Sequence, residues 1–246
     1  MKHPEYLQGW PLDFITFAPV QPSSLTTLDK LNSSAAAKAL VGRRDTTHIE
    51  TVVLYTPTSP KHAAFAAANL PMDGTYICTL DILLTPTSEG NVSIGSSDSN
   101  DPPVIDVNFN ATESDRFILR EAMRKTAHLL TGTAAGKSFA AAEVHLPNIK
   151  ATSDTSATDD DLDARIAELG MSMDHPIGSC RMAAGGPEDE RNGGVVDSRC
   201  RVFGVRGLRV VDASVFPVPM ASHIQATVYA VGEKAADIII QDAQGI

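Results

Sequence analysis

Two histidines stand in settings that suit acid/base chemistry. His175 lies in the segment MDHPIGSCRM, and His223 lies in PMASHIQATVYAVGEKAADII. A neutral imidazole can take a proton from a substrate hydroxyl, and a positioned acid or base contributes about 10² to 10⁴ in rate. A single histidine among the seven in this chain is more often structural than catalytic. The surrounding residues decide between these two interpretations.

A helix is predicted around His223. Ser222 and Gln225 have the spacing of a capping box, which would place His223 in the first turn. Residues 225–241 are apolar on nearly every face, as in a helix that is buried on most sides. The positive end of a helix disfavours an imidazolium and can stabilise a nearby anion, so it would keep His223 neutral, as a general base requires. The alternative is that His223 only begins the helix and satisfies a backbone group.

Three motifs in fixed order occupy the C-terminal part of the chain: HPIGSCRM, GGVVDSRCRVFGVRGLRVVDASVFP and HIQATVYAVGEKAADII. Together they resemble the C-terminal signature of the glucose-methanol-choline (GMC) oxidoreductases, FAD-dependent enzymes that oxidise alcohols. A weaker resemblance continues upstream through LLTPTSEGNVSIGSSDSNDPPVIDVNFNATESDRFILREAMRK and GWPLDFITFAP. It implies a substrate-binding region over residues 9–172, followed by residues 173–246 as a catalytic segment and a remnant of the FAD-binding domain.

The resemblance also implies roles for particular residues. His175 and His223 would flank the flavin on the substrate side, where one takes the hydroxyl proton while hydride leaves for the flavin. We favour His175 as the base, because the second position is histidine or asparagine in the family. The start of the last helix would lie beside the flavin pyrimidine edge and stabilise negative charge on the reduced flavin. The cofactor-binding residues implied in this way are Asp212, Ala213, Ile224, Gln225 and Ala226.

One family motif is absent from the sequence. The family carries a G-x-G-x-x-G turn near its N-terminus, where the glycines let the backbone approach the FAD pyrophosphate. No such motif occurs in this chain, and its glycine pairs at 185–186 and 193–194 fall in a polar loop. The start of the chain also matches the middle of a complete member. We therefore expect FAD if the family role is retained, and no cofactor if FAD binding is lost.

Residues 208–211 predict a short apolar strand that belongs to the central sheet of the family's FAD domain. A strand buried on both faces needs neighbours and covering helices. Without them, this strand and the last helix would expose an apolar patch that drives association. A second chain could supply the missing half, two copies could pair these surfaces, or the remnant could have repacked. The sequence therefore predicts a homo-oligomer or a partner chain that covers the remnant.

Three classes of function follow. In the first, the chain is the substrate-binding and catalytic half of a flavin-dependent alcohol oxidoreductase. In the second, the flavin is gone and the same two histidines act as a cofactor-independent acid/base pair in an isomerase, dehydratase or cyclase of a small organic metabolite. In the third, the protein binds a small molecule without catalysis. Fold resemblance alone does not choose among them.

The fold class predicted is α+β, with an antiparallel sheet flanked by helices and a C-terminal strand and helix. Stretches rich in β-branched residues predict strands at 48–55, 76–84, 91–95 and 104–109, all in one antiparallel sheet. A helix capped by Thr112 and Asp115 follows, with Ile118 and Ala122 on its apolar side and Gly132 as its stop. An acid-capped helix is predicted at 162–169.

Composition excludes several other classes. The net charge of −10 and the lack of a basic patch argue against nucleic acid as a partner. No apolar run is long enough to span a membrane, and the first residues lack the apolar core of a signal peptide, so we expect a cytoplasmic protein. Cys78, Cys180 and Cys200 have no C-x-x-C spacing, so we expect free thiols and no metal site.

Overall fold

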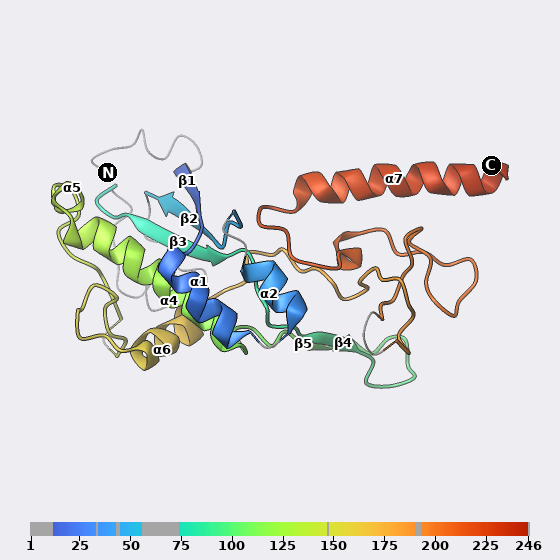
Figure 1. Cartoon of the computed structure of the whole chain (residues 1–246), viewed down its shortest axis with the longest axis horizontal. Helices are drawn as coiled ribbons and strands as arrows, with labels where there is room; N and C mark the ends of the chain where they lie inside the picture. The colour runs from blue at the N-terminus through green and yellow to red at the C-terminus, as the bar shows by residue number, and fades with distance from the viewer. Residues whose placement is uncertain are drawn as a thin grey trace. The chain divides into compact units, whose positions relative to one another are not determined.

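The computed structural model describes residues 12–32, 34–42, 45–55, 74–146, 148–189 and 193–245. The chain divides into two compact units (Figure 1). Unit 1 comprises residues 1–88 and 110–173, and unit 2 comprises residues 89–109 and 174–246. Residue 9, where the predicted substrate-binding region begins, lies outside the described residues. The assignment of residues 9–172 to substrate binding, and of residues 173–246 to a catalytic segment and a remnant of the FAD-binding domain, stays a prediction.

Unit 1 contains a three-stranded antiparallel sheet in the order β1-β2-β3. Its strands are β1 (Leu12–Ala18), β2 (Ile49–Leu54) and β3 (Cys78–Leu83). The strands predicted at 48–55 and 76–84 are confirmed, each one or two residues shorter at its ends. Strand β1 was not predicted as a strand, although its sequence lies in GWPLDFITFAP.

Helices pack around this sheet. Helix α4 (Glu113–Ala127) contacts β2, β3 and α1 (Pro22–Leu31), while α2 (Ala35–Val41) contacts α1. The short α5 (Ala134–Lys137) and the longer α6 (Asp159–Leu169) also belong to this unit. The buried core joins side chains from the sheet, α1, α2 and α4: Val20, Leu28, Val41, Ile49, Ile118 and Ala122.

The capping signals of both predicted helices are confirmed. Thr112 accepts a hydrogen bond from the backbone N–H of Asp115 at the start of α4, and Thr158 and Asp161 form a capping box at α6. Helix α6 begins three residues earlier than predicted, because its acidic first turn belongs to the helix. Helix α4 ends at Ala127 and continues as a π turn, His128–Gly132. Gly132 is required there, since a Cβ would lie 2.3 Å from the His128 ring.

Arginines of α4 join it to α6 by ion pairs. The hydrogen bond from Arg120 holds the pKa of the Glu113 carboxyl below its ordinary value. The hydrogen bond from Arg124 does the same for the pKa of Asp159. Asp81 of β3 differs, because burial raises the pKa of its carboxyl. The two lowered groups therefore favour folding when ionised, and the raised one favours folding when protonated.

The ion pairs predict a loss of stability in acid. A carboxyl with a lowered pKa stabilises the fold above its unfolded value, and this contribution disappears as pH falls through the folded pKa. We expect the thermal midpoint to decrease as pH falls below about 4, the ordinary carboxyl range. Asp81 acts oppositely, since its contribution is lost as pH rises through its raised pKa. In the double variant Glu113→Gln and Asp159→Asn, the thermal midpoint should decrease less as pH falls. A thermal midpoint with the same pH dependence as the wild type would contradict this account.

Unit 2 has less regular structure. Strands β4 (Asn91–Ser93) and β5 (Val104–Asp106) form a separate two-stranded antiparallel sheet, so the prediction of one common sheet was wrong. A 3-10 turn η3 (Ala213–Val215) and helix α7 (Gln225–Gln244) follow. Buried Val196, Val215 and Phe216 form the core, and side chains from α7 pack against them. The α+β fold class is confirmed.

The predicted strand at 208–211 is also wrong. In this segment Arg209 makes an isolated antiparallel bridge with Arg201, and the backbone N–H of Val210 donates to Cys200 at 3.1 Å. Among the described residues, only one short segment pairs with residues 208–211, so no β-ladder extends beyond this single bridge. A strand needs hydrogen-bonding neighbours along its length, and this segment has too few.

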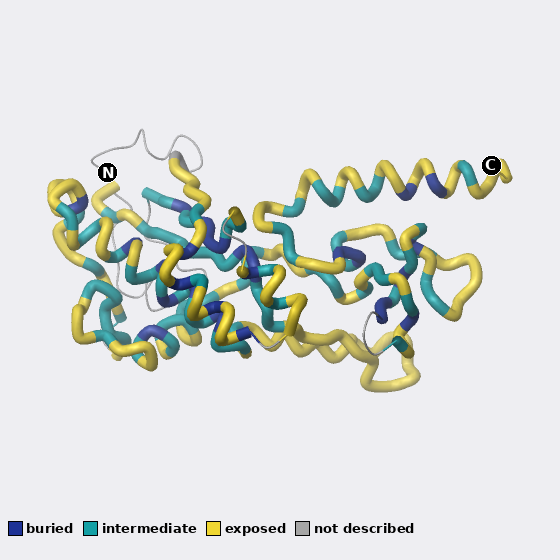
Figure 2. The backbone as a smooth tube through the Cα atoms, viewed as in Figure 1, coloured by how far each residue is buried: buried dark blue, intermediate teal, exposed yellow. Residues whose placement is uncertain are grey.

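Helix α7 exposes much of its apolar surface within unit 2. Only Ala235 and Ile238 of the helix are buried, whereas Tyr229 is 69% and Ile240 is 55% exposed. In Figure 2, buried, intermediate and exposed residues follow one another along α7. The prediction of a helix buried on most sides was wrong, and the prediction of exposed apolar residues that favour association remains open. None of the described helices is long and apolar enough to cross a membrane.

Candidate active site

The structure brings His175 and His223 together within unit 2. Nδ1 of His223 lies 3.4 Å from Nε2 of His175, within hydrogen-bonding distance. The ring centroids are 4.8 Å apart and the ring planes are inclined at 87°. Both side chains are exposed in this structure. The geometry therefore presents two adjacent ring nitrogens to solvent.

Backbone hydrogen bonds hold the segment that carries His175. The N–H of Cys180 donates to Ser214 at 3.0 Å, and the N–H of Met182 donates to Val215 at 2.9 Å. These bonds tie the residues that follow His175 to η3. Ser214 was not predicted from the sequence as an anchor, although its place in the DAS motif could have indicated it.

Gly178 makes the bend between His175 and this anchored segment. Its φ is +83°, a left-handed conformation that costs an L-residue about 1 kcal/mol or more. A Cβ there would lie 3.5 Å from the carbonyl oxygen of Phe216, which is an ordinary contact. Backbone strain is therefore the only energetic cost expected when Gly178 is replaced by alanine.

Replacing Gly178 tests this anchoring. Gly178→Ala should lower the free energy of unfolding by about 1–2 kcal/mol, because of the left-handed backbone. Chemical denaturation measures this value. The matched control is Gly232→Ala in the middle of α7, which has nothing within 4 Å of the added Cβ and should stabilise the helix. Equal effects of the two substitutions would show that Gly178 has no special backbone role.

His223 lies just before α7 rather than in its first turn. The helix begins at Gln225, its N-cap is Ile224, and no side chain caps it. The hydroxyl of Ser222 donates instead to the carbonyl of His223 at 3.3 Å. The predicted capping box was therefore wrong, because Gln225 is the first helical residue and not the third. The backbone N–H groups of the first turn receive no side-chain cap.

The two histidines are positioned by one apolar core. Ile177, two residues after His175, and Ile224, one residue after His223, both pack against the cluster of Val196, Val215 and Phe216. The adjoining residues of α7, Val228 and Val231, pack there too. The burial of these side chains therefore fixes the backbone on each side of the histidine pair.

Asp212 has a local structural role. Its side chain is the N-cap of η3, where it accepts from the backbone N–H of Ser214 at 2.8 Å. Ala213 is the first residue of that turn and packs against the unit 2 core. Asp212 itself is exposed. The DAS motif therefore forms a capped turn that connects the core to the segment of His175.

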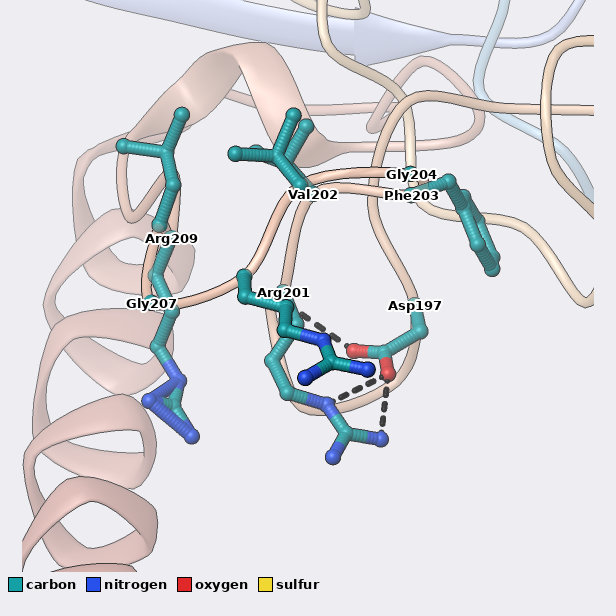
Figure 3. Close-up of a pocket in the computed structure, with 10 residues that line it drawn as sticks. Asp197, Arg201, Val202, Phe203, Gly204, Gly207 and Arg209 are labelled. Carbon is teal, nitrogen blue, oxygen red and sulfur yellow. Dashed lines mark hydrogen bonds and ion pairs between the residues drawn. The ribbon is translucent and has the colours of Figure 1, made fainter.

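An open pocket of about 450 Å³ lies elsewhere in unit 2. The turn that forms it contains Gly204 and Gly207, both with positive φ. Figure 3 shows Asp197 of this pocket accepting hydrogen bonds from Arg201, with bonds of 2.9 Å to the backbone N–H and 2.8 Å to Nε. None of the predicted site residues lines this pocket. This pocket was not predicted from the sequence, in which Gly204 and Gly207 were the available signal.

Comparison with known proteins identifies the family. The profile described as GMC oxidoreductase matches residues 86–232, more than half of the chain. The chain belongs to the GMC oxidoreductase family. The match covers both histidines and the DAS segment, so the resemblance noted in the three motifs is confirmed. Proteins of this family are FAD-dependent oxidoreductases.

Individual GMC relatives agree with this assignment. GMC-type oxidoreductase acuG of Aspergillus aculeatus is 34% identical over 240 residues, which are 96% of this chain and 42% of that protein. Versicolorin B synthase of Aspergillus parasiticus is 35% identical over 161 residues, 65% of this chain and 24% of that protein. The chain thus spans less than half the length of these relatives.

A solved GMC structure shares the fold. Formate oxidase of Aspergillus oryzae, studied for modification of its FAD, superposes with a TM-score of 0.69 and 25% sequence identity. The similarity covers 96% of this chain and 39% of that one. The fold of this chain therefore resembles part of a longer chain.

The described residues of this GMC chain fit part of an FAD molecule. The first turn of α7 presents backbone N–H groups that no side chain caps, at the exposed residues Gln225 and Ala226. Such a helix end suits the electronegative edge of a flavin ring. The sequence has no two glycines spaced as in G-x-G and so offers no pyrophosphate turn. The fit is therefore to the ring and not to the pyrophosphate.

Proposed function

We propose that this chain supplies the proton-transfer and substrate-binding part of a flavin-dependent alcohol oxidoreductase. The observation that carries the proposal is the approach of His223 Nδ1 to His175 Nε2 at 3.4 Å. The family assignment supports oxidation as the reaction class. Bound FAD would supply the hydride acceptor for the alcohol carbon. The protein's own residues would handle the hydroxyl proton and the orientation of the substrate.

The proposed roles follow from the geometry of the pair. One of the two ring nitrogens carries a hydrogen in the contact between them, and the other carries a lone pair. We assign the lone pair to Nε2 of His175. A substrate hydroxyl that enters the site would donate to this atom and accept from Nδ1–H of His223. His175 would then take the proton, while His223 would hold the oxygen in position.

The start of α7 would complete this arrangement. His223 precedes the helix directly, so the hydrogen-bonding nitrogens and the helix end come from one short segment. The residues that would hold the flavin edge are Ile224, Gln225 and Ala226. Their backbone dipoles would stabilise negative charge without rearrangement, which is the most effective form of electrostatic catalysis.

Asp212 provides a test of cofactor contact. Asp212→Ala should weaken FAD binding and also remove the cap of η3, at a cost of about 1 kcal/mol in stability. Asp212→Asn keeps a side-chain acceptor for the cap but removes the charge, so it should weaken FAD binding about tenfold with little change in stability. Equilibrium titration of FAD and chemical denaturation measure the two effects. Wild-type FAD affinity in Asp212→Asn would show that the carboxylate does not contact the cofactor.

A second function would use the same histidines without a flavin. An isomerase, dehydratase or cyclase needs only the proton transfers that the His175–His223 pair could perform. Such a reaction would need no G-x-G-x-x-G motif, and this sequence contains none. The two functions differ in one observable: only the first leaves the protein with a bound flavin that an alcohol reduces. Turnover that continues without FAD would replace the first proposal by the second.

A further inference from the structure

We propose that His175 and His223 also form a binding site for a divalent transition-metal cation of the Zn²⁺ type. The two ring nitrogens that approach each other, Nδ1 of His223 and Nε2 of His175, would be its protein ligands. Water would occupy the other coordination positions. The proposal concerns a different donor set from the cysteines, whose spacing gave no zinc site.

The separation of the two nitrogens matches a shared metal ion. Zn²⁺ binds imidazole nitrogen at about 2.0–2.1 Å in tetrahedral geometry, so two ligand nitrogens of one ion lie about 3.4 Å apart. The observed distance between the two nitrogens is 3.4 Å. The same distance is long for a hydrogen bond, whose heavy atoms are usually about 2.7–3.2 Å apart. The ring positions therefore suit one bridging ion at least as well as one hydrogen bond.

The orientation and the exposure of the two rings also suit coordination of a metal ion. The rings are nearly perpendicular, with an interplanar angle of 87°, so they do not stack face to face. Both side chains are exposed in this structure. Among the described residues, no group of three His, Cys, Asp or Glu side chains could hold a metal. The site is thus a two-histidine site that leaves positions open for water.

The backbone on both sides of the pair is fixed before any ion arrives. Residues after His175 are tied to η3 by hydrogen bonds from Cys180 and Met182. Ile224, next to His223, is packed against the buried core of unit 2. Two ligands that are already positioned lose little conformational freedom on binding, which raises affinity. Imidazole ligands favour Zn²⁺ over Mg²⁺, which prefers oxygen ligands.

Metal binding would compete with the proton transfer proposed above, and this consequence rests on that proposed function. An ion at the pair would occupy the lone pair assigned to Nε2 of His175. The hydrogen assigned to Nδ1 of His223 would move to Nε2 of the same ring, because a neutral imidazole binds a metal through its unprotonated nitrogen. Zn²⁺ would therefore inhibit any reaction that uses the pair. Direct binding can be measured without turnover, so failure of the metal site and failure of the proposed function are distinguishable.

The experiment is a calorimetric titration of the full chain, free of any histidine tag, with ZnCl₂. We expect one site that is lost, or weakened at least about tenfold, in both His175→Ala and His223→Ala. The matched control is His145→Ala, which removes another exposed histidine and should leave the binding unchanged. A titration with MgCl₂ should show no binding at this site. Circular dichroism establishes that each variant is folded.

Two results would overturn the proposal. One is Zn²⁺ binding of wild-type affinity in either single variant, because a two-ligand site cannot survive the loss of a ligand. The other is the absence of Zn²⁺ binding in the wild-type chain. If either alanine variant were unfolded, His175→Asn and His223→Asn would replace it with a smaller change of shape. The same loss of affinity is expected in these variants.

Discussion

His175→Ala is expected to lower kcat/KM for an alcohol substrate by about 10² to 10⁴, the contribution typical of a positioned general base. The reason is that Nε2 of His175 is the atom to which the substrate hydroxyl would donate its proton. The side chain is exposed and lies outside the core, so the fold should remain intact. Steady-state kinetics with FAD present, together with a denaturation curve, measures both quantities.

The second histidine separates the roles of the two rings. His223→Ala should also reduce kcat/KM strongly, but His223→Asn should retain part of the activity because its amide N–H can still donate to the substrate oxygen. His175→Asn should recover nothing, since an amide cannot accept the proton. The control is His145→Ala in unit 1, with unchanged kinetics. Full turnover in both alanine variants would mean that the pair is wrongly assigned, and rescue by His175→Asn would reverse the two roles.

The largest expected effect on stability comes from Arg120→Ala. The Arg120 side chain is only 3% exposed, and it forms ion pairs with Glu113 and with Asp163 at 2.8 Å, which joins α4 to α6. Its removal leaves a cavity and brings together carboxylates that have lost their counter-charge. We expect a loss of about 3 kcal/mol in the free energy of unfolding, the low end for a broken buried ion pair, because the partner carboxylates are partly exposed.

The control for this prediction is Arg124→Ala in the same network. Its side chain is 39% exposed and pairs with Asp159 at 2.6 Å. Exposed ion pairs contribute about 0–1 kcal/mol, so this variant should be nearly as stable as the wild type. Urea denaturation of both variants provides the comparison. If Arg120→Ala cost no more than Arg124→Ala, burial of the arginine would not be what stabilises the contact between the helices.

Local signals in the sequence predicted much of unit 1 correctly. The strands around β2 and β3 follow from β-branched residues bounded by turn residues. The start of α4 follows from Thr112, whose side chain accepts a backbone hydrogen bond in the structure, whereas the cap of α6 at Thr158 was not predicted. The juxtaposition of His175 and His223 came from the family resemblance, since 48 residues separate them and no periodicity links them.

The errors fall where long-range contacts decide the local structure. Residues 208–211 have the composition of a strand, but pairing depends on neighbours that the local pattern does not specify. The start of α7 was placed too early, because Ser222 bonds to the carbonyl of His223 instead of capping the helix. The spacing of apolar residues along the sequence does not reveal such contacts.

The most direct test of the proposed function is the absorption spectrum of the purified chain, recorded with excess FAD and then after anaerobic addition of an alcohol. The proposal predicts that flavin stays with the protein through gel filtration and that the alcohol bleaches its absorbance. In His175→Ala the flavin should stay bound but remain oxidised. A protein that emerges colourless, or a bound flavin that no alcohol reduces, would contradict the proposal and favour proton transfer without a flavin.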